Sequence, residues 1–318
     1  MKTKVKFFIV SIFLICIAIN AFANDNFLEE VRKGNLRKVK SYISHGVSIE
    51  YKNKAGVNAL MVSVFFNRAK IMNYLLNAGA KIDVMTNNKM TALMFACMKG
   101  RYRIVKLLIS RNANIHLIAK NGMTPLIWAA KSGYSNIVRL LANKGAKVNV
   151  KDINGMSPVL FASKFGYFEM LKFLHRKGAN LKARDNTGWT ALMLACLKNR
   201  YNIVKYLVRK RLNLELRNKK GFTALILSVM FASNRVIYYL VEKGANVNSA
   251  IKGGLYIQNG YTPLMFAISR KRMKIIRYLV NKGANVNAKN ATGNTILQRA
   301  KTEGNEEIIE FLKSKGAR

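Results

Sequence analysis

The chain has 318 residues, of which 55 are Lys or Arg and 14 are Asp or Glu, so its formal net charge is +41. Such a positive field attracts nucleic acid, anionic lipid headgroups, acidic glycans and acidic proteins, and all of these are admissible partners. With three His, three Cys and scattered acids, the composition disfavours a zinc site, a disulfide-dependent fold and a catalytic pair of carboxylates.

The first 23 residues have the pattern of a secretory signal peptide. Three lysines precede an apolar stretch, 7–19, and residues 21–23 (Ala-Phe-Ala) form an A-x-A cleavage site. The apolar stretch is shorter than the roughly 20 residues that a membrane-spanning helix needs, and an uncleaved anchor is the alternative. We expect cleavage after Ala23, export to the periplasm or the cell exterior, and no transmembrane span.

Two markers recur along the rest of the chain with a period of thirty-three residues. One is a hydroxyl residue that opens a similar apolar phrase, at Thr91, Thr124, Ser157, Thr190 and Thr223. The other is a position that is usually glycine, at Gly79, Asn112, Gly145, Gly178, Arg211 and Gly244. Two independent markers with one period indicate tandem repeats, each of which buries its apolar face against its neighbours.

The repeat resembles the ankyrin repeat, which reads G-x-T-P-L, a short helix with A-A, a glycine turn, a helix with I-V-x-x-L-L, and G-A-x-V-N. Residues 121–150 (NGMTPLIWAAKSGYSNIVRLLANKGAKVNV) match this pattern nearly throughout. The family's His after T-P-L is absent, and the chain mostly has Met, Ile or Leu there, so apolar packing has to replace its hydrogen bonds. The resemblance implies an all-α solenoid of helix-turn-helix units with β-hairpin loops.

The repeat register divides the chain into a signal peptide (1–23), an incomplete N-terminal capping repeat (24–52) and eight ankyrin repeats (53–318). The expected repeats are 53–85, 86–118, 119–151, 152–184, 185–217, 218–256, 257–289 and 290–318. The last of them is rich in acids, as a polar cap would be. Six extra residues fall within 248–260, which suggests a long hairpin with a glycine turn. This hairpin is either a tolerated surface insertion or part of a binding face.

Several positions within the repeat have expected structural roles. The hydroxyl residue should cap the first helix by accepting an N–H of the first turn. The Leu141 position, which is Leu in every full repeat, should form the centre of the core. A left-handed residue should follow the second helix, a conformation that suits Gly145 and Asn112 better than Arg211. Cys97 and Cys196 share one repeat position and should be buried and reduced.

The residue before each hydroxyl marker lies on the hairpin finger, a position that is exposed and often contacts a partner in the ankyrin family. Here the column reads Val57, Met90, Met123, Met156, Trp189, Phe222, Tyr261 and Asn294. Positions near the end of the first helix add Phe65, Phe66, Met98, Phe165, Leu197, Met230 and Phe231. Together they predict a concave stripe of Met and aromatic side chains, and such exposed patches usually mark interaction sites. The alternative is that they pack laterally along the hairpins and are half hidden.

We therefore expect an exported, non-enzymatic and monomeric scaffold that binds a protein through this stripe and its basic flanks. The expected contact residues are Met90, Met123, Met156, Trp189, Phe222, Tyr261, Phe165, Met230 and Phe231. No catalytic residue, metal ligand or cofactor is expected. The alternative is a polyanion binder, for instance a secreted effector, whose affinity should fall steeply with salt. The export signal disfavours nucleic acid as the polyanion.

Overall fold

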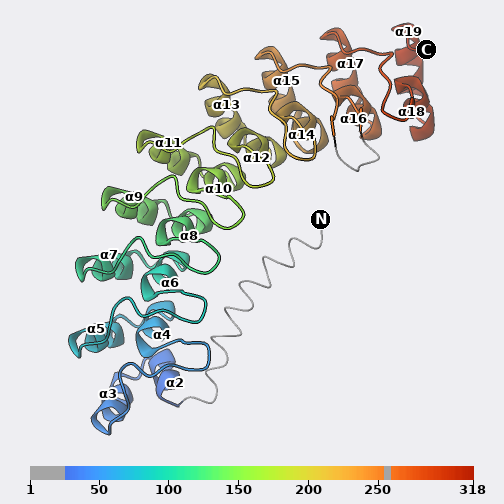
Figure 1. Ribbon diagram of the computed structural model, residues 1–318. Helices are drawn as coiled ribbons and strands as arrows, with labels where there is room; N and C mark the ends of the chain where they lie inside the picture. Colours follow the sequence, from blue (N-terminus) through green and yellow to red (C-terminus); the bar gives the residue numbers. More distant parts are fainter. Residues whose placement is uncertain (1–25, 254–258) are drawn as a thin grey trace. The chain divides into compact units, whose positions relative to one another are not determined.

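The computed structural model describes residues 26–253 and 259–318, which divide into two compact units, Met1–Ile153 and Asn154–Arg318 (Figure 1). The expected signal peptide lies outside the described residues, as does the middle of the expected 248–260 hairpin. Each unit is described by itself below.

Unit 1 (Met1–Ile153) contains four helix pairs, each made of a helix of an inner row and one of an outer row (Figure 1). The inner helices are α2 (Asn26–Lys33), α4 (Ala59–Phe65), α6 (Ala92–Met98) and α8 (Pro125–Ser132). The outer helices are α3 (Leu36–Ser44), α5 (Ala69–Asn77), α7 (Tyr102–Ser110) and α9 (Ser135–Asn143). Successive inner helices pack against one another, and loops that form the fingers leave the inner row on the side away from the outer helices.

Unit 2 (Asn154–Arg318) repeats this arrangement in five helix pairs. Its inner helices are α10 (Pro158–Phe165), α12 (Ala191–Leu197), α14 (Ala224–Phe231), α16 (Pro263–Ser269) and α18 (Ile296–Glu303). Its outer helices are α11 (Phe168–Arg176), α13 (Tyr201–Arg209), α15 (Asn234–Glu242), α17 (Met273–Asn281) and α19 (Glu306–Ser314). The regular elements among the described residues are helices, and isolated β-bridges close the bases of some fingers. The predicted all-α helix-turn-helix repeat is confirmed.

The inner helices begin where the sequence predicts. Thr91 has an extended backbone, and its hydroxyl accepts the Met94 N–H at 3.3 Å. The same bond forms at Thr124, Thr190, Thr223, Thr262 and Thr295, and Asn58 makes it with an amide oxygen. Ser157 is an exception, because its hydroxyl makes no capping bond and is buried without a partner. Each cap satisfies a backbone donor that the first helical turn leaves unpaired.

The predicted leucine column forms the centre of both cores. Its members are fully buried at Leu75, Leu108, Leu141, Leu174, Leu207, Leu240, Leu279 and Leu312. Truncating such a leucine costs about 2–5 kcal/mol, because the packed interior collapses only partly around the cavity. The left-handed residues after the outer helices are also as predicted, with φ of 92° at Gly145, 63° at Asn112 and 54° at Arg211.

Within each unit, neighbouring fingers are joined by backbone hydrogen bonds. In unit 1 the Asn87 N–H donates to the Ala55 carbonyl at 3.1 Å, and in unit 2 the Lys219 N–H donates to the Thr187 carbonyl at 2.9 Å. These bonds fix the register of successive fingers, and they hold the residues at the finger bases against the inner helices.

Backbone hydrogen bonds within a single finger follow the same pattern in the sixth and seventh repeats. In the sixth repeat the Asn218 N–H donates to the Phe222 carbonyl, and the Gly221 N–H donates to the Asn218 carbonyl. Ile251 makes the equivalent pair with Tyr261 and Gly260, both at 2.9 Å. Ile251 therefore makes the backbone bonds that Asn218 makes in the preceding repeat, six residues before the expected start of the seventh repeat at 257.

Candidate functional site

The structure corrects the prediction that the finger column is exposed. Met90, Met123, Met156 and Tyr261 are all buried, with exposed fractions of 4%, 2%, 8% and 8%. The reason is clear at Tyr261, whose ring lies 5.5 Å from the ring of Phe266 on α16, the inner helix that begins just after it. A side chain just before the helix cap packs beneath the finger and onto that helix. These four side chains therefore follow the alternative of lateral packing along the hairpins, and they are more deeply buried than that alternative implies.

Two other members of the column, Trp189 and Phe222, are only half-buried. They belong to the successive repeats of α12 and α14, which pack against each other. Leu197 and Met230 at the ends of these helices are also half-buried, and Phe231 is 43% exposed. We call Trp189, Leu197, Phe222, Met230 and Phe231 the apolar patch of unit 2. Five partly exposed apolar side chains on two adjacent repeats make this region the candidate interaction surface, since exposed apolar patches usually mark such sites.

Phe165, the remaining predicted contact residue, is half-buried on the preceding repeat. Its ring stacks on Phe161 at 6.3 Å and lies 5.9 Å from Tyr167. Two members of the expected stripe in unit 1, Phe65 and Phe66, also cover each other. Phe65 contacts Phe66 and Phe95 edge-to-face, and the Lys99 ammonium lies 4.1 Å from the Phe65 ring centroid.

One cation lies against the apolar patch, and two more are close to its residues in the chain. The Arg270 guanidinium lies 5.8 Å from the Phe231 ring centroid, and Lys198 and Lys219 are exposed nearby in the repeat register. The acid of this region, Asp185, is engaged by the backbone, because its Oδ1 accepts the Trp189 N–H at 2.9 Å. The patch therefore combines apolar rings with positive charge, and an acidic partner fits that combination.

Two arginines that the sequence reading missed fix the fingers that carry Trp189 and Phe222. Arg184 Nε donates to the Gly188 carbonyl at 3.2 Å, and Arg217 Nη1 donates to the Gly221 carbonyl at 3.0 Å. Each guanidinium also bonds to a backbone carbonyl of the next repeat. Arg184 and Arg217 are thirty-three residues apart, and this spacing of one repeat could have indicated their shared role. They pre-organise the patch by holding its two fingers in place.

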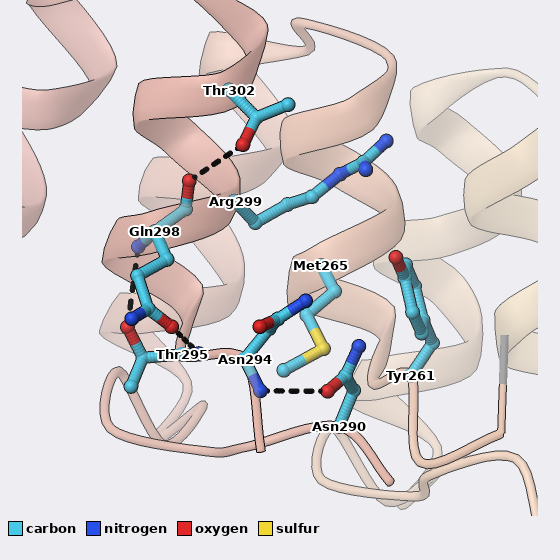
Figure 2. A pocket seen from close by; sticks show the side chains of 8 residues that line it. All are labelled: Tyr261, Met265, Asn290, Asn294, Thr295, Gln298, Arg299 and Thr302. Carbon is cyan, nitrogen blue, oxygen red and sulfur yellow. Dashed lines mark hydrogen bonds between the residues drawn. The ribbon is translucent and has the colours of Figure 1, made fainter. Parts of the chain in front are cut away.

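A second feature of unit 2 is a pocket of about 380 Å³ between the last two inner helices, α16 and α18 (Figure 2). It is lined by Tyr261, Met265, Asn290, Asn294, Thr295, Gln298, Arg299 and Thr302. Of these, sequence reasoning singled out Tyr261 alone as a contact. The sequence indicates the pocket only through a change to polar residues in the last repeat. Asn294 and Arg299 stand there in columns that are apolar in the preceding repeats.

The two cysteines are buried as predicted and form no disulfide with each other. Burial raises the pKa of the Cys97 thiol well above its ordinary range and raises the pKa of Cys196 to about 12, although the Ser228 side chain lowers the latter slightly. Thiols with such pKa values stay protonated at neutral pH and are poor nucleophiles. No group of three or more His, Cys, Asp or Glu side chains in the described part of the chain could hold a metal ion.

The family comparison agrees with this architecture. The description "Ankyrin repeats (3 copies)" matches residues 28–119, 79–152, 112–185, 159–251 and 250–318. The chain therefore belongs to the ankyrin repeat family, whose repeats generally mediate protein–protein interactions and typically serve as non-enzymatic scaffolds. A search of curated proteins finds no match. Among residues 26–253 and 259–318, no helix is long and apolar enough to cross a membrane.

Proposed function

We propose that this chain is an exported, monomeric, non-enzymatic scaffold that binds an acidic protein through the apolar patch of unit 2 and the cations around it. The observation that carries the proposal is the partial exposure of Trp189, Phe222 and Phe231 on two adjacent repeats, with Phe231 at 43%. Trp, Tyr and Arg are the usual energetic centres of interfaces, and here an Arg lies against one of the exposed rings.

The division of labour follows from the physics of such surfaces. Burial of a large aromatic side chain supplies affinity, because apolar surface leaves water. The positive field around the patch accelerates encounter with an acidic partner and selects against basic ones. Export is supported by the pattern of residues 1–23, and N-terminal sequencing of the mature protein tests it: Asn24 should be the first residue.

The binding experiment compares two truncations in the mature chain. Trp189→Ala and Phe231→Ala should each weaken capture of the partner by roughly 30-fold, the effect of about 2 kcal/mol at a hot spot. Tyr102→Ala is the matched control, because Tyr102 is 39% exposed but lies on outer helix α7 of unit 1. Equal losses in all three variants, or none in the first two, would exclude the patch as the binding surface.

A specific observation also favours the second candidate, a polyanion-binding protein. At the ends of the outer helices of unit 2, a lysine ammonium lies 5.6–6.0 Å from the centroid of an aromatic ring four residues earlier. The lysines are Lys177, Lys210, Lys243, Lys282 and Lys315, over Phe173, Tyr206, Tyr239, Tyr278 and Phe311. We call this row the lysine ladder. A regular row of exposed cations suits a linear polyanion, although lysines also stabilise helix C-termini.

Heparin is a suitable probe for this second function. Replacing three ladder lysines by Gln should lower heparin affinity and flatten its dependence on salt, whereas Trp189→Ala should leave both unchanged. The opposite result, with heparin binding sensitive to Trp189 and indifferent to the ladder, would reject the ladder as a polyanion site.

A further inference from the structure

The pocket between α16 and α18 exists because the last repeat replaces apolar side chains with polar ones. Phe266 and Leu227 occupy, in the two preceding repeats, the column that Arg299 occupies in the last, and both are buried. Asn294 likewise stands where the two preceding repeats have Tyr261 and Phe222. A hollow remains beside the Met265 side chain, which is 2% exposed and forms part of the floor.

The hydrogen bonds within the pocket decide which polar atoms remain for a ligand. Asn290 Oδ1 accepts the N–H groups of Thr292 at 3.1 Å and Asn294 at 2.9 Å. Gln298 Oε1 accepts the Thr295 N–H at 2.7 Å. These bonds fix the orientation of both amides, because only the oxygen can accept from a backbone N–H. The amide nitrogens, which can only donate, have no partner among the described residues.

A comparison along the register supports this reading of Asn290. Asn53 and Asn218 occupy the same position in other repeats, and their Nδ2 atoms are enclosed without a partner. Asn290 instead borders the pocket, as Figure 2 shows, where its amide lies beside Asn294 and the Met265 thioether. The same side chain that is closed off in the sixth repeat is therefore available to a ligand in the last one.

Arg299 adds a fixed guanidinium to these donors. Its Nε donates to Ser269 Oγ at 2.9 Å, and its Nη2 pairs with Glu303 at 2.5 Å. The two bonds hold the side chain in one orientation and leave Nη1 without a hydrogen bond among the described residues. Glu303 compensates the charge of Arg299, so the pocket is a set of oriented donors within a positively charged unit rather than a bare cation.

We propose that this pocket binds the carboxylate of an Asp or Glu side chain from an acidic segment of the partner. The proposal rests on the proposed function, since it assigns a second contact of the same acidic partner on unit 2. A carboxylate only accepts hydrogen bonds, so each of its oxygens can accept from one of the donors that line the pocket, which are the Asn290 and Gln298 amide N–H groups and Arg299 Nη1. Figure 2 shows the Gln298 amide and the Arg299 guanidinium well apart from each other, so one carboxylate engages some of these donors rather than all of them. The pocket volume of about 380 Å³ accommodates such a side chain together with adjoining main chain.

The probe is a short fluorescent peptide of alternating Ser and Glu, with a Ser-Gln peptide as the uncharged control. Fluorescence anisotropy with the mature chain should show binding of the Ser-Glu peptide only. Arg299→Gln should weaken that binding about tenfold, because a charge-assisted bond is lost. Arg277→Gln is the matched control, since Arg277 also pairs with a glutamate, Glu307, at 3.3 Å but lies outside the pocket. It should change binding by less than about twofold, as expected for an exposed pair.

Asn294→Leu tests the pocket without changing any charge. It restores the apolar residue type of this column and fills the cavity, so Ser-Glu binding should again fall about tenfold while the fold is retained. In nuclear magnetic resonance spectra, the side-chain amide signals of Asn290 and Gln298 should shift when the peptide is added. Equal losses for Arg299→Gln and Arg277→Gln, unchanged binding by Asn294→Leu, or no binding by the unaltered chain would each overturn the proposal.

The failure of this inference is separable from failure of the proposed function. The Ser-Glu peptide has no aromatic contact to make with the apolar patch, so Trp189→Ala should leave its binding unchanged. If Trp189→Ala leaves partner capture unchanged while Arg299→Gln still weakens peptide binding, the apolar patch is rejected and the pocket is retained. If Trp189→Ala weakens partner capture but the chain does not bind the peptide, the pocket is rejected and the apolar patch is retained.

Discussion

Trp189 and Asp185 hold each other in the finger of the fifth repeat. The Trp189 N–H donates to Asp185 Oδ1 at 2.9 Å, and the Asp185 N–H donates to the Trp189 carbonyl at 3.1 Å. The same carboxylate oxygen accepts the Thr187 N–H and hydroxyl, both at 2.9 Å. One acid thus positions the largest side chain of the apolar patch, because the Asp185 carboxylate accepts hydrogen bonds from within its own finger.

Two substitutions of Asp185 should distinguish the contribution of its hydrogen-bond acceptor from the contribution of its negative charge. Asp185→Ala removes the acceptor for two backbone N–H groups and should cost about 1–2 kcal/mol of stability. Asp185→Asn should cost much less, because Asn218 and Asn290 make the same bonds with an amide oxygen. Urea unfolding of the two variants measures the difference, and similar losses in both would show that charge rather than the acceptor matters.

The two tryptophans should respond oppositely to truncation. Trp128 is 4% exposed on α8, so Trp128→Ala should cost about 3–5 kcal/mol of stability. Trp189 is half-buried, and Trp189→Ala should cost about 1 kcal/mol. Acrylamide quenching in single-Trp variants should be stronger for Trp189. Equal shielding of both rings, or global unfolding of Trp189→Ala, would assign Trp189 to the core.

The sequence predicted those parts of the fold that depend on one residue and its own repeat. The capping hydroxyls, the leucine column and the left-handed Arg211 follow from local backbone geometry and from burial on every repeat. The exposure of the finger column did not follow, because it depends on how each side chain packs against the inner helix. Met156 is buried whereas Trp189 at the same position is half-buried, and no periodicity distinguishes them.

The pocket could not be predicted for a related reason. It arises where the last repeat departs from the others, and a register built on the similarity of repeats gives no information about such departures. The polar residues of the last repeat were read as a cap, since a polar end closes the stack. That reading explains why Gln298 is exposed, but the orientation of its amide follows only from the bond to the Thr295 N–H.

The buried thiols should make stability depend on pH. Burial raises the pKa of both cysteines in the folded chain, to about 12 for Cys196, while an unfolded thiol ionises near about 8.5. The unfolded state therefore loses protons first, and stability should fall as the pH rises above about 8.5. Urea midpoints between neutral and alkaline pH measure this fall. The slope should be smaller in Cys97→Ala and Cys196→Ala, which adopt the residue found at Ala130 in the same repeat position.

Arg211 should be a place where substitution stabilises the chain. Its φ of 54° is a left-handed conformation that costs a residue with a side chain roughly 1 kcal/mol, and most repeats have Gly there. Arg211→Gly should therefore raise the free energy of unfolding by up to about 1 kcal/mol. Arg209→Gly, at the end of helix α13, should lower it by a similar amount. A loss in both variants would mean that the Arg211 side chain outweighs the backbone cost.

The sharpest test of the capping argument is the pair Thr190 and Ser157. They occupy the same position in neighbouring repeats, and both are buried. The Thr190 hydroxyl accepts the Met193 N–H at 3.2 Å, whereas the Ser157 hydroxyl makes no capping bond and has no partner among the described residues. Thr190→Ala should cost about 1–2 kcal/mol, because a helix donor loses its acceptor. Ser157→Ala should be neutral or slightly stabilising, because it removes a buried polar atom that is already unpaired. Chemical denaturation of both variants decides it: equal losses would mean that Ser157 caps its helix in solution.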